Sequence, residues 1–187
     1  MTETYEYVLQ KKHRAFRKEV TEDFAAEFSA GKLPLAERIV RRFERLAAAE
    51  EPHILPGEQI VFLRTTGKAG DVMTKEEWEE YRANSGEIHE LGYTSNLCGN
   101  YAALLCEGLN AVRERADEYA RREIDAILSL TDRYREEARR TGRNDVAAVL
   151  SEVPRKPATT FREALQFFRI LHFSLWLEGC YHNTVGR

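Results

Sequence analysis

The sequence predicts a mainly helical fold with one or two short strands. Apolar residues recur at three- and four-residue spacing through most of the 187-residue chain, and charged residues, 32% of the total, lie between them. Two capping-box patterns mark helix starts, at Thr74–Glu77 and Thr160–Glu163. One run alone, Gln59–Leu63, has strand composition. The length is sufficient for a single domain over residues 1–187 with its own core.

The first third of the chain is expected to contain two helices. Residues 4–28 carry apolar side chains at helical spacing among Lys, Arg and Glu, and Gly31–Pro34 breaks the pattern. A second helix is expected over residues 35–49. Its apolar stripe is Leu35, Ile39, Phe43 and Leu46, and the remaining surface is expected to be covered by Arg38, Arg41, Arg42 and Arg45.

The segment after this helix cannot be helical, because Pro52 and Pro56 both bias the preceding residue towards extended backbone. Pro56-Gly57 is typical of a turn. Gln59–Leu63 is then predicted to be a short, buried strand. The capping box at Thr74 predicts a short helix that continues through Tyr81.

The second half begins with a loop over residues 86–100 and is helical from Tyr101 onward. The polar tract of residues 113–122 fits either a turn or a solvated helix face. Further helices are expected over residues 145–153 and, after a proline-bounded connector, from the Thr160 cap onward.

Charge and cysteine content exclude several classes. With 28 basic and 31 acidic residues, the net charge of -3 gives no electrostatic reason to bind nucleic acid or an anionic membrane. The longest apolar run, Phe167–Leu177, is interrupted by Arg169 and His172, and the acidic N-terminus lacks a signal core, so a cytoplasmic location is expected. Three cysteines without close spacing favour reduced thiols over disulfides or a zinc knuckle.

The loop Leu91–Tyr101 combines glycines, amides and the Cys98 thiol just before a helix. Glycines let backbone approach a ligand closely, which favours a substrate-contacting loop. The alternative is an ordinary helix start with Asn100 as its N-cap, and such caps are far commoner than binding sites. Both interpretations remain open on the residues alone.

A second polar group lies near the end of the chain, at His172, Glu178, Cys180 and His182. These residues lack the helical His spacing and the second ligand set of a zinc site, so no metal is expected. His172, inside an apolar helix, is expected to be a hydrogen-bonded core residue, and Glu178 to be the partner of a buried arginine. His182-Asn183, beyond Gly179, is the better pocket candidate.

An ordered series of landmarks resembles the N-terminal part of the glycyl radical enzymes, the superfamily of pyruvate formate-lyase and the glycerol and diol dehydratases. The landmarks are Leu35–Arg38, Arg42–Arg45, Pro56–Val61, Asn100-Tyr101, Glu107–Leu109, Val153-Pro154, Thr160–Gln166, His172, Glu178 and Gly186-Arg187. They cover most of the chain from Leu35 onward.

The resemblance implies a ten-stranded α/β barrel wrapped by helices, of which residues 1–187 would be an N-terminal, truncated part. In that family a separate S-adenosylmethionine radical activase installs a glycyl radical, which oxidises an active-site cysteine to a thiyl radical. Both groups belong to the family's C-terminal portion. The chain alone is therefore expected to be inactive, with no catalytic residue and no bound cofactor. Its implied partners are a small-molecule substrate, the activase and the missing part of the barrel, with homodimerisation left open.

The resemblance also implies four substrate-binding residues. Asn96 and Asn100 occupy positions where dehydratase-like members carry a His and an Asp, and His182-Asn183 replaces a His-Ser pair. Side-chain amides orient hydroxyl groups but cannot act as bases near neutral pH. The reaction therefore stays open between a radical lyase or dehydratase and a formate-lyase-like acyltransferase. Cys98 lies in the wrong segment to be the thiyl cysteine.

Two other functions fit the sequence. One is a stand-alone helical protein-interaction module, suggested by the charged helices and the single strand. The other is one subunit of a split radical enzyme. A radical-enzyme segment is expected to expose a large apolar surface around Phe161–Leu177, whereas a stand-alone module would not.

Overall fold

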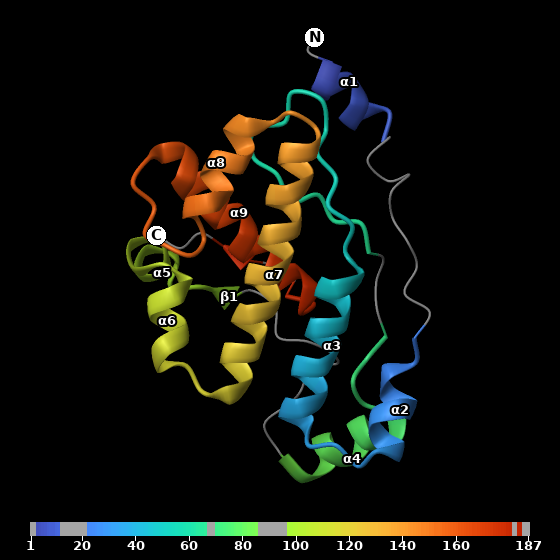
Figure 1. Ribbon diagram of the computed structural model, residues 1–187. Helices are drawn as coiled ribbons and strands as arrows, with labels where there is room; N and C mark the ends of the chain where they lie inside the picture. The colour runs from blue at the N-terminus through green and yellow to red at the C-terminus, as the bar shows by residue number, and fades with distance from the viewer. Residues whose placement is uncertain (1–2, 12–21, 67–69, 86–96, 181–182, 185–187) are drawn as a thin grey trace.

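The structure is a computed structural model that describes residues 3–11, 22–66, 70–85, 97–180 and 183–184. The described part is mainly helical, as expected (Figure 1). The first four helices are α1 (Glu3–Leu9), α2 (Phe24–Ala30), α3 (Leu35–Ala49) and α4 (Lys75–Ser85). They are followed by α5 (Tyr101–Glu107), α6 (Leu109–Arg115), α7 (Glu118–Arg140), α8 (Asn144–Glu152) and α9 (Phe161–Leu177). The strands are β1 (Leu97–Cys98) and β2 (Asn183–Thr184).

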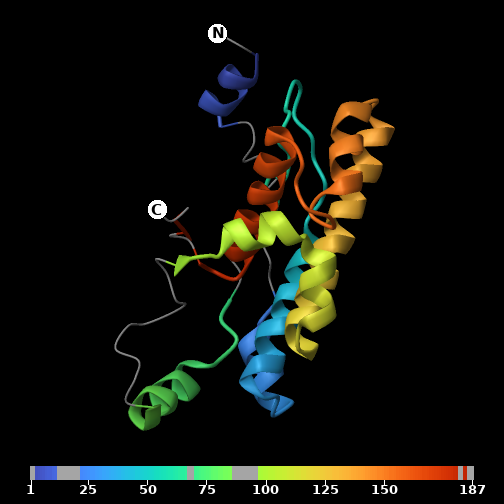
Figure 2. The same cartoon turned by 90° about the vertical axis from the view of Figure 1, so that its left-hand side faces the viewer.

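Helix α7 is the centre of the described fold. It packs along α3 on one side and against α8 at its C-terminal end, and α9 crosses it (Figure 1). Helix α5 in turn lies across α9, as Figure 2 shows. The main core, gathered from α2, α3, α7, α8 and α9, includes Phe28, Phe43, Leu130, Tyr134, Leu150, Ile170 and Phe173. A second cluster beneath α5 contains Tyr101, Leu109, Leu128, Val153, Phe167 and Leu171.

The arginines of α3 do not form one solvated face as the sequence suggested. Arg38 and Arg42 are 8% and 3% exposed. Arg38 donates to the carbonyl oxygens of Leu33 and Val72 and binds the Glu77 carboxylate with both terminal nitrogens, at 2.8 and 2.9 Å. These two guanidinium groups therefore connect α3 to backbone and carboxylate groups far along the chain.

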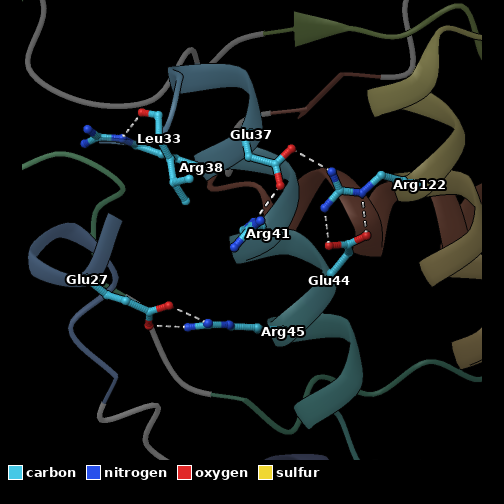
Figure 3. Close-up of polar contacts among 8 residues, drawn as sticks. All are labelled: Glu27, Leu33, Glu37, Arg38, Arg41, Glu44, Arg45 and Arg122. Carbon is cyan, nitrogen blue, oxygen red and sulfur yellow. Dashed lines mark hydrogen bonds and ion pairs between the residues drawn. The ribbon is translucent and has the colours of Figure 1, made fainter. Parts of the chain in front are cut away.

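The other α3 charges join neighbouring helices (Figure 3). Arg122 of α7 binds both oxygens of Glu44, at 2.9 and 2.7 Å, and reaches Glu37 at 2.7 Å. Arg45 binds Glu27 of α2. Hydrogen bonds from Arg122 and then Arg41 hold the pKa of Glu37 below its ordinary value. Single surface pairs contribute little, but this network fixes the orientation of α3 against α7.

Between Tyr101 and the end of α7 at Arg140, the helical region is interrupted twice. At Gly108 the backbone has a φ of 79°, and the amides of Leu109 and Asn110 donate to the carbonyls of Pro154 and Arg155. A Cβ at Gly108 would lie 2.5 Å from the Arg155 carbonyl oxygen, so only glycine fits this close approach. The second break falls at Asp117, whose side chain accepts from the Ala120 amide at 2.8 Å and caps α7. The tract 113–122 therefore contains a turn.

Both predicted capping boxes are confirmed. The Glu163 amide donates to Thr160 Oγ1 at 3.2 Å, and the Glu163 carboxylate accepts from the Thr160 amide at 3.0 Å. Thr74 and Glu77 make the same reciprocal pair at the start of α4. Helix α4 continues four residues beyond the predicted end at Tyr81, to Ser85.

The strand predicted at Gln59–Leu63 was wrong, because the residues there bond to side chains rather than to another strand. The side-chain amide of Gln166 on α9 accepts from the Val61 amide at 2.9 Å and donates to the Val61 carbonyl at 3.3 Å. The Phe62 carbonyl accepts from Arg169 at 2.6 Å, and the Leu63 carbonyl accepts from the Tyr134 hydroxyl at 2.9 Å. Only Val61 and Phe62 of the predicted strand are buried, and no strand forms there.

The same segment continues into a buried carboxylate site. Glu50, fully buried at the end of α3, accepts from the backbone amides of Thr65 and Thr66 at 2.6 and 3.1 Å. The two threonine hydroxyls also donate to it. Four donors thus satisfy one buried carboxylate, which meets the requirement that a buried charge be hydrogen-bonded.

Candidate functional site

The two sequence stretches singled out for substrate binding meet in a short parallel pair of strands. Leu97 of β1 lies opposite Asn183 of β2, and Cys98 lies opposite Thr184. The pairing places Asn183 beside the loop that leads to Asn100. Asn96 and His182, the other two predicted binding residues, lie outside the described residues. The structure does establish that the segment following Asn96 and the segment following His182 pair with each other.

Asn100 is the N-cap of α5. Its side-chain oxygen accepts from the Ala103 amide at 3.4 Å, so the cap interpretation is confirmed. The residue is exposed. Its side-chain nitrogen forms no hydrogen bond with any described residue and can donate to a ligand. Capping and ligand binding are therefore compatible at this position.

An aromatic stack under α5 supports this site. Tyr101 is 6% exposed, and its ring meets that of Phe168 edge-on with centroids 5.0 Å apart. Phe168 in turn lies 6.0 Å from the ring of His172. Burial, followed by the charge of Arg169, lowers the pKa of His172 below its ordinary value. His172 was expected to be a hydrogen-bonded core residue. It is half-buried instead, and its ring packs against the ring of Phe168.

A tight turn at the end of α9 leads the chain towards β2. The amides of Glu178, Gly179 and Cys180 donate back to carbonyls of the last helical turn, at 3.2, 3.1 and 2.9 Å. Gly179 has a φ of 92°, which favours glycine because a side chain would clash in that conformation. The turn is therefore built into the local sequence Glu178-Gly179-Cys180.

Glu178 carries the strongest electrostatic perturbation near β2. Its Oε1 is buried and has no hydrogen-bond partner among the described residues. Burial, reinforced by the charge of Glu123 on α7 and opposed by Arg42, raises the pKa of Glu178 to about 8. Glu178 was expected to be the partner of a buried arginine, and Arg42, which the sequence placed on a solvated face, is buried and lowers the pKa of Glu178. The described hydrogen bonds of Arg42 go to the carbonyl oxygens of Gly70 and Leu177. The sequence reasoning missed the second carboxyl, Glu123, because α7 is distant in the chain.

The Cys180 thiol near the end of α9 is not activated. Burial and the neighbouring Glu178 raise the pKa of Cys180, which keeps it protonated and weakly nucleophilic. Cys106, on α5, is exposed. Among the described residues, no group of three or more His, Cys, Asp or Glu side chains is placed to hold a metal ion. None of the helices described is both long enough and apolar enough to cross a membrane.

Two surface hollows lie away from the strand pair. One, of about 300 Å³, is lined by residues of the α2–α3 turn and α4, including Leu33, Met73 and Tyr81. The other, of about 260 Å³, lies between α3 and α7 and is lined by residues that include Ala47, Ala126 and Arg133. Neither includes a residue of β1, β2 or α5. Asn100, the one predicted binding residue whose side chain the structure describes, does not line either hollow.

Comparison with known proteins supports the resemblance seen in the sequence. The model of the pyruvate formate lyase-like family matches residues 68–187, which is more than half of the chain and includes α4 through α9 and both strands. Searches of curated proteins and of solved structures found no match. On the strength of the family match, the chain belongs to the pyruvate formate lyase-like family.

Proposed function

We propose that this chain is the N-terminal, helical portion of a glycyl radical enzyme and that the β1–β2 pair forms part of the wall of its substrate pocket. The observation that supports the proposal is the parallel pairing of Leu97-Cys98 with Asn183-Thr184. Parallel strands joined by long helical connections are the building unit of α/β barrels. The pair would be the first step of such a barrel, completed by the rest of the enzyme.

The residues at this wall suit a small polar substrate. Asn96, Asn100 and Asn183 supply amide groups that both donate and accept hydrogen bonds, so they can orient hydroxyl or carbonyl groups. His182 adds an imidazole, the side chain that exchanges protons near neutral pH. In this proposal these groups bind and orient, while the thiyl cysteine and the radical glycine are supplied by the later portion of the enzyme. The chain alone is then inactive.

The proposed partners follow from the same assignment. A separate S-adenosylmethionine radical activase would install the radical, and the remaining barrel would close the pocket over β1 and β2. The reaction class is a radical lyase or dehydratase, or a formate-lyase-like acyl transfer. We place the enzyme in anaerobic metabolism in the cytoplasm.

The first test is the reading frame beyond Arg187 in the source DNA. The proposal expects that frame, or a neighbouring one in the case of a split enzyme, to encode the cysteine loop and the radical glycine. A stop codon at that point, with neither motif encoded nearby, would overturn the assignment.

The second test concerns the pocket wall and uses the complete enzyme under anaerobic conditions. Asn183→Ala should raise KM or lower kcat/KM about tenfold or more, since a lost substrate hydrogen bond costs about 1–2 kcal/mol. The amplitude of the glycyl radical signal in electron paramagnetic resonance should be unchanged. Asn110→Ala, an exposed helical position on α6, is the matched control. Equal kinetics in the two variants would remove Asn183 from the pocket.

Asn100 needs a pair of variants because it also caps α5. Asn100→Ser keeps a capping oxygen but loses the amide donors, whereas Asn100→Ala loses both. A substrate role predicts that the two variants lose similar catalytic efficiency while Asn100→Ala alone loses stability. If Asn100→Ser retains full activity, the residue is a cap only.

A stand-alone interaction module remains a second candidate, and the burial of α9 favours it. Phe167, Ile170, Phe173 and Leu177 are each at most 2% exposed and are covered by this chain's own helices. The apolar exposure expected along Phe161–Leu177 is concentrated at Phe161 and Leu165, which are 79% and 40% exposed. Weak binding of a hydrophobic dye and a cooperative unfolding transition of the isolated chain would favour the module. Strong dye binding would favour the enzyme segment.

A further inference from the structure

Glu178 stands where helix α9 ends and the chain turns towards β2. Four residues, 179–182, separate it from Asn183, and the tight turn through Gly179 fixes the direction in which the chain leaves the helix. The last carbonyl of α9, that of Leu177, is held by Arg42 Nη1 at 3.2 Å. A change at Glu178 acts directly on this turn, whose last described residue, Cys180, precedes Asn183 by three positions.

The charges that face Glu178 are unbalanced. From α7 comes the carboxyl of Glu123, which raises the pKa of Glu178, and from α3 comes the guanidinium of Arg42, which lowers it. On the C-terminal side of the turn lies the Cys180 thiol. Glu123 is itself largely removed from water. Its burial, followed by the charges of Asp117 and Glu44, raises its pKa.

An ionised Glu178 would thus be a buried carboxylate near a second carboxyl, with one oxygen that receives no hydrogen bond from the part of the chain that the structure describes. Such a group is costly to bury unless it is paired. Protonation removes the charge without moving the helix. The alternative is movement of the turn towards water, where the charge can be solvated.

We propose that Glu178 is a positioning residue for the β1–β2 pair: as the neutral acid it allows α9 to end in the tight turn that delivers β2, and its ionisation loosens that pair. The importance of this for substrate rests on the proposed function, in which the pair is a pocket wall. The effect on the strands themselves does not depend on that assignment.

The direction of the pH effect follows from the raised pKa. The folded chain binds the Glu178 proton more tightly than the unfolded chain does, because the pKa is about 8 in the fold against an ordinary value of 4.5. Rising pH therefore weakens the folded arrangement between these two values. At pH 7 the residue is mainly neutral, and near pH 8 half of the molecules carry the charge.

The test is a titration of the isolated chain by nuclear magnetic resonance from pH 6 to 9.5, following the amide signals of β1 and β2. The wild-type signals of Leu97, Cys98, Asn183 and Thr184 should shift with a common midpoint near pH 8. In Glu178→Gln this transition should disappear. In Glu123→Gln it should move to lower pH, since the repulsive neighbour is gone.

Two further variants keep the proposal falsifiable. Glu136→Gln removes an exposed carboxyl from α7 and should leave the midpoint unchanged. If Glu178→Gln does not fold, Glu178→Met supplies an uncharged, non-titrating side chain for the same comparison. The proposal is overturned if the transition persists without a carboxyl at position 178. It is also overturned if the Glu178 carboxyl titrates in the wild type while the strand amides do not respond.

Kinetics of the complete enzyme separate this inference from the proposed function. If both hold, kcat/KM falls as the pH rises through 8 in the wild type and falls less in Glu178→Gln, while Asn183→Ala is impaired at every pH. A strand titration without any effect of Asn183→Ala would refute the pocket wall alone. An effect of Asn183→Ala with no strand titration would refute the role of Glu178 alone.

Discussion

Two non-helical stretches of this protein are held in opposite ways. Residues 61–66, here called the anchored segment, lie in the core, and their backbone groups bond to side chains of α3, α7 and α9. The β1–β2 pair consists of two residues on each side, and its ladder joins backbone to backbone. The anchored segment is held by several hydrogen bonds to specific side chains, whereas the β1–β2 pair is held by a two-residue backbone ladder.

The difference separates a scaffold element from an adjustable one. The bonds of the anchored segment come from four side chains, those of Gln166, Arg169, Tyr134 and Glu50, so releasing the segment requires opening the core. A two-residue ladder is too short to be stable by itself and depends on what surrounds it. Such elements can open locally while the rest of the fold stays intact. A wall that must admit a substrate belongs to the second kind.

The largest effect is expected from Glu50, which binds four donors of the anchored segment. Glu50→Ala should lower the free energy of unfolding by about 3–5 kcal/mol, because two backbone amides and two hydroxyls lose their buried acceptor. Urea denaturation measures the change. Glu114→Ala, at an exposed position on α6, is the control. A loss no greater than that of the control would show that the anchors do not hold the segment.

A smaller loss is expected at Gln166, which substitutes for a neighbouring strand by bonding both backbone groups of Val61. Gln166→Leu should cost about 2–4 kcal/mol in the same measurement, since a buried N–H and C=O are left without partners. Leu165→Gln, one residue away and 40% exposed, should change stability little. Similar values for the two variants would contradict the anchoring role.

Tyr134 tests a single anchor. Its hydroxyl donates to the Leu63 carbonyl at 2.9 Å, while its ring stacks on Phe62 with centroids 4.3 Å apart. Tyr134→Phe keeps the ring and removes the hydroxyl, so the loss should be about 1–2 kcal/mol. Tyr134→Leu, which also removes the stack, should cost more. Calorimetric unfolding of both variants would separate the hydrogen bond from the ring packing.

The smallest effect on global stability is expected from the β1–β2 pair. Thr184→Gly should change the free energy of unfolding by less than about 1 kcal/mol, the full span of strand propensities. Amide hydrogen exchange should show the contrast directly. The amides of Val61 and Thr65 should exchange only with global unfolding, and those of β1 and β2 by local opening. Equal protection of both stretches would remove the distinction between them.

Much of the helical fold could be predicted, because its signals are local. The Thr160–Glu163 and Thr74–Glu77 boxes and the Asn100 cap each involve residues three apart, so the sequence contains the complete motif. The break at Gly108 was missed, because the glycine is required by a contact with Arg155, far along the chain. The strand at Gln59–Leu63 was predicted for the right reason, burial of an apolar run, but its partners proved to be side chains.

The candidate site could likewise be predicted from the sequence only in part. The sequence pointed to two stretches near Asn100 and Asn183 through their resemblance to a family, and the family match supports that relationship. Their pairing in one parallel ladder was not visible in either stretch by itself. Nor was the second carboxyl near Glu178, since Glu123 comes from a helix that approaches only in the folded chain.

By itself, the sequence of this protein determined most of the helical segments, though not the breaks at Gly108 and within residues 4–28, as well as where several helices begin and to which family the chain is related. The tertiary structure decided which non-helical backbone becomes a strand and which is held by side chains, and it raised the pKa of one glutamate at the end of α9. The physical reason is the separation along the chain over which each interaction acts. Caps and apolar periodicity act within a few residues, whereas strand partners and the burial of a charge depend on segments brought together only by packing.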